Sequence, residues 1–380
     1  MSCNLKSTSP LPHELWVCIF SLSGVVHNRL PSALELGQEG DFLHVEAEKL
    51  ELKRWKAALS LRLVCRLWNA IIAQILYRDI CVGTEARWPS LSSGLKQPSI
   101  AGLVRSIRLS TSRFDRNVLV LSQCTNVEVL IHPEFPHSQR MYAIWETLLP
   151  ELPLLKRVYW RMSWSSSTLL RDIVSAAKNL EYATFSASDA YNYGLNDRPS
   201  SSPLSTSTQP TMALRSLELM HSGELFARTM LSTNVSRLTH LTLDTAHLAL
   251  APRVLPALRV LKLSVNDKHE PAHLTVSFPV ILALCGHTLR ELVYDARCAV
   301  APPAPGQEAR ALHCVRLLSP DAMQAANQNA NAQVLLGPAF SALISILLDG
   351  PGWRDPNEQE WPEWAQLRKR GCQVEAGNAY

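Results

Sequence analysis

The sequence contains an H-E-x-x-H match at His269-Glu270-Pro271-Ala272-His273. On a helix this spacing puts both imidazoles on one face, where they can bind zinc beside a glutamate general base. Pro271 stands inside that would-be helix, where it would remove a backbone hydrogen bond and clash with the preceding turn. The match also lies between two strand-like runs, LRVLKLS and LTVSF. We therefore interpret it as a loop with two solvated histidines and expect no metal site; a zinc site is the alternative.

Other candidates for metal binding or nucleophilic chemistry lack the spacing that such chemistry needs. They are Cys285, His287, Cys298, His313 and Cys314. The nine cysteines show no regular spacing, which favours free thiols in a reducing compartment. The sequence has no GxGxxG, GxxxxGK[ST] or GxSxG, and no nucleophile, base and orienting acid can be named. We expect a protein without catalytic residues or cofactors.

Binding chemistry is the remaining possibility, and arginine and tyrosine are residue types favoured at protein interfaces. Candidates for binding a target protein occupy alternate positions of strand-like segments: Arg108, Arg157, Tyr159, Arg161 and Tyr182. Later segments carry acidic residues at the same positions: Glu218, Asp244, Glu291 and Asp295. Our hypothesis is a partner protein whose charges complement this gradient, and the alternative is a solvated sheet face.

These alternate positions belong to a repeat of the form L-x-x-L-x-L, in which the leucines point to the core. Its copies begin at Val104, Val127, Leu155, Leu180, Leu214, Leu238, Leu258, Leu289 and Leu312. Most intervals fit the period of roughly 20–29 residues typical of leucine-rich repeats. The pattern predicts an α/β fold over residues 100–375: an irregular leucine-rich-repeat solenoid, with a curved parallel sheet and helices on its outer side. A Ser/Pro/Thr-rich loop insert is expected at 187–211.

Segments between and after the copies complete this prediction. Helices are expected at 165–179, 277–288, 338–349 and 361–370, and a last edge strand at 372–375. Residues 299–310 are predicted to form a Pro-rich loop, and the Asn/Gln/Ala-rich stretch 321–333 has no assigned structure.

The N-terminal part contains two blocks with dense apolar residues at helical spacing, 11–22 and 59–80. The first opens with Pro12, which suits the first turn of a helix. In the second, one apolar row runs from Leu63 to Ile75 and the adjacent row from Val64 to Leu76. So short a helical unit has more apolar surface than it can bury by itself. It needs either the rest of the chain or a partner.

At these residues the sequence resembles an F-box, most closely that of mushroom-type fungal proteins. The resemblance rests on LPxELWxxIF at 11–20 together with LVCRxWNxII and LYRxI in the second block. It implies a helical F-box domain over residues 1–82, with an insert at about 23–54.

F-box proteins with leucine-rich repeats are substrate receptors of SCF-type (Skp–cullin–F-box) ubiquitin ligases. The resemblance therefore implies a Skp-type adaptor, a cullin–RING assembly, an unknown target protein held by the repeats, and a cytoplasmic or nuclear location. Carried over by motif, the adaptor-binding positions are Leu11, Pro12, Leu15, Ile19, Leu63, Val64, Cys65 and Trp68. A repeat scaffold without a ubiquitin-ligase role is the alternative.

Composition sets limits on other partners. A net charge of +4 over 380 residues, without a dense Lys/Arg cluster, does not indicate a nucleic-acid interface. No apolar run approaches the ~18 residues that a membrane span needs. We expect neither nucleic acid nor membrane as a partner.

Overall fold

The computed structural model divides the chain into two compact units. The boundary falls between Tyr159 and Trp160, and residues 134–138 are grouped with the second unit. The structure describes residues 12, 15, 16, 19, 56, 58–83, 87–109, 113–132, 152–162, 179–187, 214–220, 227, 231, 235–250, 255–265, 274–318, 325–350 and 362–376. None of the described helices is long and apolar enough to span a bilayer.

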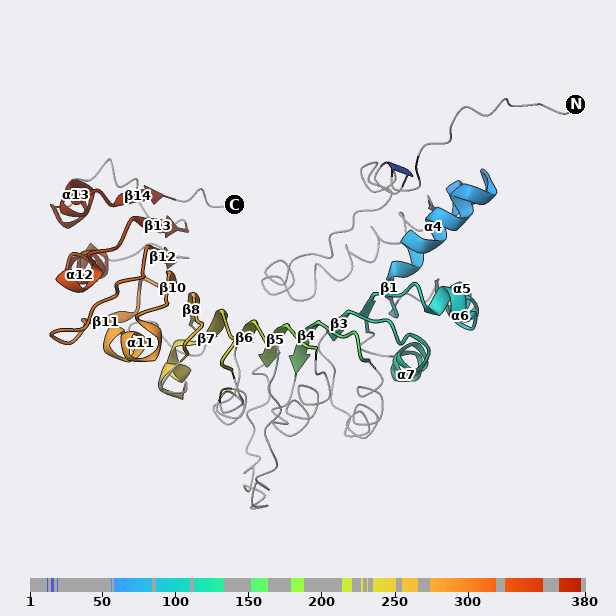
Figure 1. The fold of residues 1–380 in the computed structure, drawn as a ribbon, viewed down its shortest axis with the longest axis horizontal. Helices are drawn as coiled ribbons and strands as arrows, with labels where there is room; N and C mark the ends of the chain where they lie inside the picture. The colour runs from blue at the N-terminus through green and yellow to red at the C-terminus, as the bar shows by residue number, and fades with distance from the viewer. Residues whose placement is uncertain are drawn as a thin grey trace, which may run out of the picture. The chain divides into compact units, whose positions relative to one another are not determined.

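The first unit begins with helical segments (Figure 1). The Pro12 carbonyl accepts hydrogen bonds from the amides of Leu15 and Trp16, so a helical turn begins at Pro12, where the sequence predicts it. Helix α4 follows the turn at residues 63–65. The helices of this unit are α4 (Arg66–Arg78), α5 (Trp88–Leu95), α6 (Pro98–Ala101) and α7 (Phe114–Gln123).

Three short parallel strands of the first unit pair in chain order: β1 (Asp79–Cys81), β2 (Ser106–Arg108) and β3 (Val129–His132). Their apolar residues are in register, with Ile80 opposite Ile107 and Ile107 opposite Leu130. Strand β4 (Arg157–Met162) starts beside β3, because the amides of Lys156 and Arg157 both donate to the Glu128 carbonyl.

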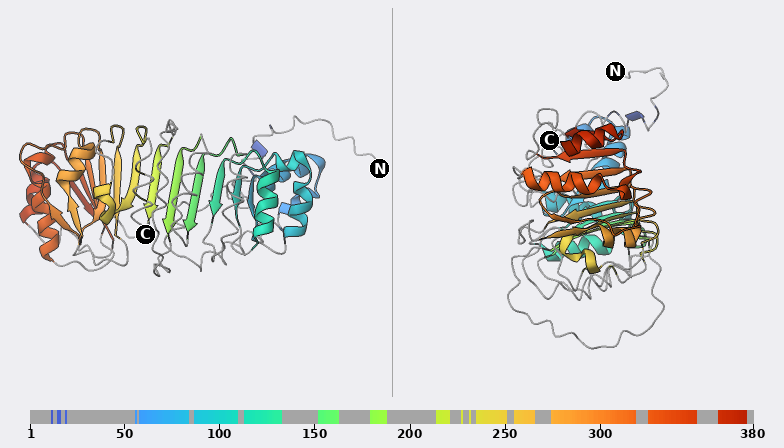
Figure 2. Two further views of the ribbon diagram at one scale, coloured as in Figure 1. Left: turned by 90° about the horizontal axis from the view of Figure 1, so that it is seen from below. Right: turned by 90° about the vertical axis from the view of Figure 1, so that its left-hand side faces the viewer.

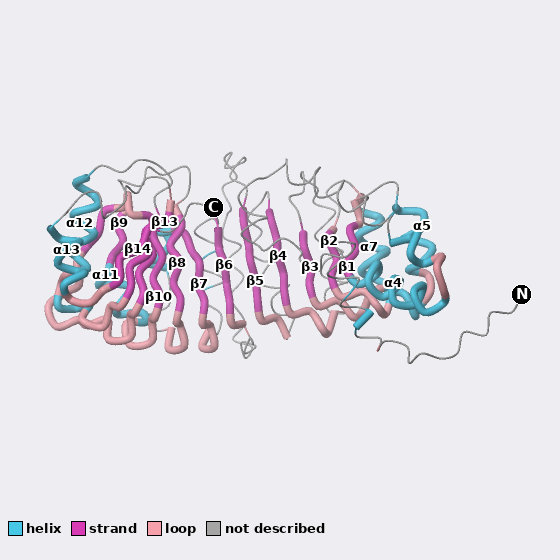
Figure 3. The backbone as a smooth tube through the Cα atoms, turned by 90° about the horizontal axis from the view of Figure 1, so that it is seen from above, coloured by secondary structure: helices cyan, strands magenta, loops and turns pink. Residues whose placement is uncertain are grey.

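The second unit is built on parallel strands in the order β5-β6-β7-β8-β10-β12-β13-β14 (Figure 1). Figure 3 shows the first of them, β5 to β8, side by side. Their bounds are β5 Tyr182–Ala187, β6 Ser216–Met220, β7 His240–Asp244, β8 Val260–Ser264, β10 Glu291–Asp295, β12 Cys314–Leu318, β13 Ser345–Asp349 and β14 Gln373–Ala376. A separate parallel pair joins β9 (Thr275–Ser277) to β11 (Ala299–Ala301). All nine predicted copies of the repeat are strands, β2 to β8, β10 and β12.

The core of the second unit consists of two in-register ladders of apolar side chains. One ladder passes through Leu217, Leu241, Leu261 and Leu292, and the other through Leu219, Leu243 and Leu263. All seven leucines are at most 1% exposed. Because successive residues of a strand point to opposite faces, the residues between the leucines lie on the other face of the sheet. The repeat leucines therefore point to the core, as predicted.

Helices of the second unit lie on the outer side of its strands (Figure 2). They are η4 (Thr245–Leu250), α11 (Phe278–Cys285), α12 (Ala325–Leu335), η6 (Pro338–Phe340) and α13 (Pro362–Lys369). Phe278 of α11 packs edge-to-face on Tyr294 of β10 and on Phe340 of η6, at ring-centroid distances of 6.2 and 4.9 Å. The predicted helices at 277–288 and 361–370 are confirmed, and so is the edge strand at 372–375.

Several predictions differ from the structure. The helix predicted at 338–349 is wrong: only Pro338–Phe340 is helical, and Ser345–Asp349 forms β13. The sheet begins before residue 100, at β1, and the Pro-rich segment starts with β11. The unassigned stretch 321–333 contains most of α12. The H-E-x-x-H match, the insert 23–54 and nearly all of 165–179 and 187–211 lie outside the described residues.

Candidate functional site

A turn at residues 63–65 divides the second apolar block, which the sequence presents as one helical pattern. Cys65 has extended backbone angles (φ −160°, ψ 168°) and caps α4, because its Sγ accepts the Trp68 amide at 3.4 Å. Across the turn, Arg62 Nε donates to Asn69 Oδ1 at 2.7 Å. The turn leaves Leu63 and Val64 88% and 60% exposed. Neither side chain contributes to the core.

Trp16 and Trp68 join the two N-terminal blocks. Their ring centroids are 5.4 Å apart and the ring planes are tilted by 57°. This contact connects residues on either side of the insert 23–54, so the insert does not prevent the two blocks from meeting. Tilted aromatic pairs at this distance add about 0.5–1.5 kcal/mol beyond the area that they bury.

The two halves of α4 have opposite environments. Its C-terminal half packs into the first unit through Ile71, Ile72, Leu76 and Tyr77. Its N-terminal half and the residues near it expose large apolar side chains. We call this set the apolar docking surface: Leu15, Ile19, Leu59, Leu63, Val64 and Leu67.

The adaptor-binding positions implied by the F-box resemblance coincide with this surface. Pro12, Leu15, Ile19, Leu63, Val64 and Cys65 are exposed, and Trp68 is half-buried against Trp16. Leu11 lies outside the described residues. The sequence alone did not indicate Leu59 and Leu67 as surface residues, because both continue helical rows that become buried further along the chain.

The predicted target-binding residues are divided between the two units. In the first unit, Arg157 is exposed and Arg108 and Tyr159 are half-buried. In the second unit, Tyr182 is half-buried, and the Arg161 side chain lies outside the described residues. Each occupies a strand, as predicted. Ser106, which shares this alternation, is buried at the start of β2.

Two acidic residues assigned to the binding face are instead structural. Asp244 and Asp295 are only 2% and 5% exposed. Each carboxylate accepts a hydrogen bond from the backbone amide two residues further on. Asp244 accepts it from Ala246 at 3.1 Å, and Asp295 accepts it from Arg297 at 2.9 Å. Short Asp side chains that close such turns are common at the ends of strands. The acidic part of the predicted gradient is therefore weaker than the sequence indicates.

The sheet face of the last repeats carries an ion network. Arg316 on β12 lies 3.8 Å from Glu291 on β10 and 3.2 Å from Asp349 on β13, measured between the charged atoms. Neighbouring strands thus neutralise one another here. All three side chains are partly exposed, so each pair contributes little to the free energy of unfolding.

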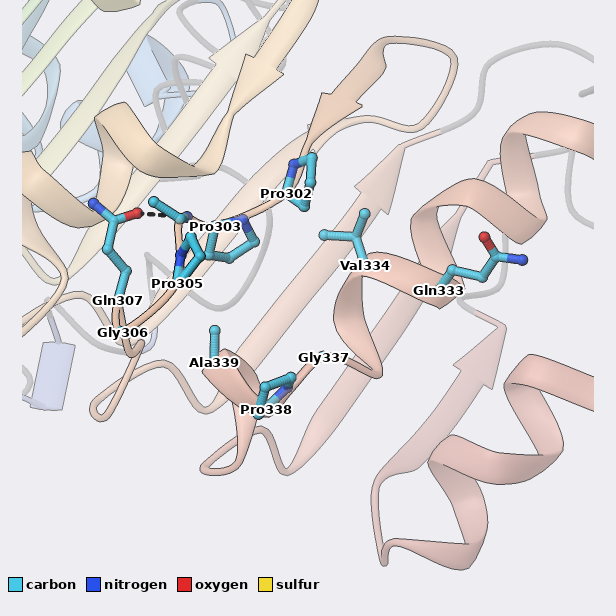
Figure 4. A pocket seen from close by; sticks show the side chains of 11 residues that line it. Pro302, Pro303, Pro305, Gly306, Gln307, Gln333, Val334, Gly337, Pro338 and Ala339 are labelled. Atoms are coloured by element: carbon cyan, nitrogen blue, oxygen red, sulfur yellow. Dashed lines mark hydrogen bonds between the residues drawn. The ribbon is translucent and has the colours of Figure 1, made fainter.

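A pocket of about 340 Å³ opens in the second unit between the Pro-rich loop and α12–η6 (Figure 4). Pro302, Pro303 and Pro305 form one side, and Val334, Pro338 and Ala339 lie opposite. Gln307 fixes the loop by accepting the Ala304 amide at 3.0 Å. The lining offers apolar contacts and two glutamine side chains, and none of its residues is titratable.

The candidate cysteines Cys285, Cys298 and Cys314 are free thiols; Cys285 and Cys298 are buried, and Cys314 is half-buried. Burial raises the pKa of Cys285 and of Cys298 to about 12, so both stay protonated at neutral pH. No group of three or more histidine, cysteine or acidic side chains with metal-binding geometry occurs among the described residues.

Comparisons with known proteins add little to this geometry. No family model and no curated protein matches the sequence. Among solved structures, the chain is similar to the crystal structure of the leucine-rich repeat-containing protein LegL7 from Legionella pneumophila. The two are 14% identical over 77% of this chain and 97% of that chain, with a TM-score of 0.39. At this TM-score the likeness supports no functional conclusion, and the repeat architecture follows from the strand register described above.

Proposed function

We propose that this protein is a substrate-recognition subunit of an SCF-type ubiquitin ligase. The apolar docking surface would bind a Skp-type adaptor, and the repeat strands would hold a target protein. The observation that carries the proposal is the exposure of the F-box-like positions around the Trp16–Trp68 contact. A motif that served only the internal core of the unit would be expected to bury them.

Energetics favour a protein partner for this surface. Burying a Leu or Val side chain that is otherwise exposed stabilises an association by about 1.5–3 kcal/mol. Leu63 is held outward by the capped turn, so it can enter a partner's groove without rearrangement of α4. Preorganisation of this kind lowers the entropic cost of binding.

In this role the chain contributes proximity instead of catalytic groups. A target held on the strands would be close to a ubiquitin-charged enzyme that the adaptor recruits. The target would then experience a high effective concentration of the ubiquitin-charged enzyme. The proposal places the catalytic residues in other subunits.

Co-purification with a Skp-type adaptor tests the proposal. We expect Leu63→Asp combined with Val64→Asp to abolish adaptor binding, because two carboxylates would have to be desolvated at the interface. Both side chains are exposed, so the double variant should keep the thermal stability of the wild type. Trp68→Ala is a poorer test, because it also removes the packing on Trp16.

The matched control is Ile344→Asp, which changes an exposed apolar residue of the second unit. This variant should bind the adaptor as the wild type does. If the wild type itself fails to bind, or if the double variant still binds, the ubiquitin-ligase link is refuted and an interaction scaffold without that link is left.

A further inference from the structure

The residues that come immediately before the strands form a row at the N-terminal ends of the strands in each unit. The turns that lead into the strands lie at these ends in Figure 3. In this row the backbone carbonyl of one member accepts a hydrogen bond from the backbone amide of the next. Arg290 donates to Arg259 at 2.8 Å, and His313 donates to Arg290 at 3.0 Å. The ladder fixes the order and spacing of the side chains.

In the first unit an acidic residue separates two basic members of the row. The row starts with Arg78 before β1 and continues with Arg105, Glu128 and Lys156. Glu128 lies 3.5 Å from the side-chain nitrogen of each basic neighbour. Glu128 thus offsets the repulsion between Arg105 and Lys156.

The second unit starts its row in the same way and then changes. Glu181 lies 4.0 Å from Arg215. The following members carry no acidic side chain: Thr239, Arg259, Arg290, His313, Ile344 and Cys372. Arg259, Arg290 and His313 are all exposed. Among the described residues, no ion pair engages the guanidinium of Arg259 or Arg290. Arg310, in the loop before β12, is already paired with Glu308.

Two arginines and a histidine therefore stand directly before three neighbouring strands, β8, β10 and β12. Neighbouring strands are about 4.8 Å apart, so the row places two guanidinium groups at a short spacing with the His313 imidazole next to them. Glu128 offsets the repulsion between its basic neighbours in the first unit, whereas the row has no acidic member beside Arg259 or Arg290. A ligand with its own negative charges would offset the repulsion here.

From this row we infer that Arg259, Arg290 and His313 form a docking site for an acidic segment of a partner protein. Guanidinium groups bind carboxylates through paired, charge-assisted hydrogen bonds, and arginine is enriched among residues that dominate binding energy. The partner would supply the carboxylates that Glu128 supplies within the first unit.

A protein segment fits this row better than a single-stranded nucleic acid. Binding of single strands relies on aromatic side chains that stack with bases, and the row has none from Glu181 to His313. The inference does not depend on the adaptor link, because it concerns a different surface in a different unit.

Fluorescence anisotropy with a labelled oligoglutamate peptide tests the site on the full chain. We expect salt-sensitive binding to the wild type, weakened on the order of ten-fold by Arg259→Glu with Arg290→Glu. His313→Glu should also weaken it, because the new carboxylate would pair with Arg290 in the way that Glu128 pairs with Arg105. All three positions are exposed, so both variants should melt like the wild type.

The control is Lys96→Glu with Lys369→Glu, which changes the net charge equally at exposed sites away from the row. It should alter binding by less than about two-fold. Equal losses in the control and the row variant would reduce the effect to net charge and refute the site. Tighter binding of a single-stranded oligonucleotide, lost in the same row variant, would assign the row to nucleic acid and overturn the proposal.

Discussion

Asn331 is fully buried in the second unit and connects α12 to the end of β10. Its Oδ1 accepts a hydrogen bond from Tyr294 Oη at 2.7 Å, and its Nδ2 donates to the Ala296 carbonyl at 2.9 Å. Asn331→Ala would leave a buried hydroxyl and a buried carbonyl without these partners, at about 1–3 kcal/mol for each group. We expect a clearly lower midpoint in urea unfolding.

Tyr294→Phe provides the matched comparison, because it removes the hydroxyl and keeps the ring that packs on Phe278. Since both changes disrupt the same hydrogen bond, the double variant should cost less than the sum of the single variants. Strict additivity would show that the two groups do not interact in solution. The sequence gives no sign of this network, because Asn331 stands in a polar, low-complexity stretch.

The residues of the candidate site were predictable in identity but not in environment. Leu63 and Ile71 belong to one helical row, yet Leu63 is 88% exposed and Ile71 is fully buried. The difference arises at Cys65, where the turn ends one helical segment and α4 begins. A thiol cap is a weak signal beside the Ser, Thr, Asp and Asn caps that usually mark a helix start.

The alternation of side chains between the two faces of β8 can be tested by mutation. Leu261 and Lys262 are neighbours in β8, but Leu261 is fully buried in the ladder between Leu241 and Leu292, and Lys262 is half-buried on the other face. Leu261→Ala should lower the free energy of unfolding by about 2–5 kcal/mol through cavity formation. Lys262→Ala should change it by less than about 0.5 kcal/mol. Equal effects in chemical denaturation would contradict the assigned faces.

Most strands could be predicted because the repeat places leucines with both a fixed spacing and a fixed face. β13 was missed although Leu343, Ile346 and Leu348 follow the same pattern. Ile344 and Leu347 make that run apolar on both faces, and a short continuous apolar run does not distinguish a strand from a helix. β1 has only three residues and directly follows α4, so the helical pattern obscures it.

At the scale of the whole molecule, buried thiols link stability to alkaline pH in both units. Burial raises the pKa of Cys124 in the first unit, and of Cys285 and Cys298 in the second, from 9.0 to about 12. Between these values the unfolded chain loses protons that the folded chain retains. The contribution of these thiols to the free energy of unfolding is therefore fully present below pH 9 and is lost as the pH rises towards 12.

The slope of that loss can be measured. Each thiol contributes at most about 1.4 kcal/mol per pH unit, so Cys285 and Cys298 together contribute up to about 2.8 kcal/mol per pH unit. Cys285→Ala with Cys298→Ala should be less stable than the wild type at pH 7, because two buried side chains are truncated. Its urea midpoint should nevertheless fall less steeply above pH 9, since the remaining titrating groups are common to both proteins. Parallel curves for the two proteins would show that these thiols are accessible to water in the folded state, against the packing of α11 and the turn after β10.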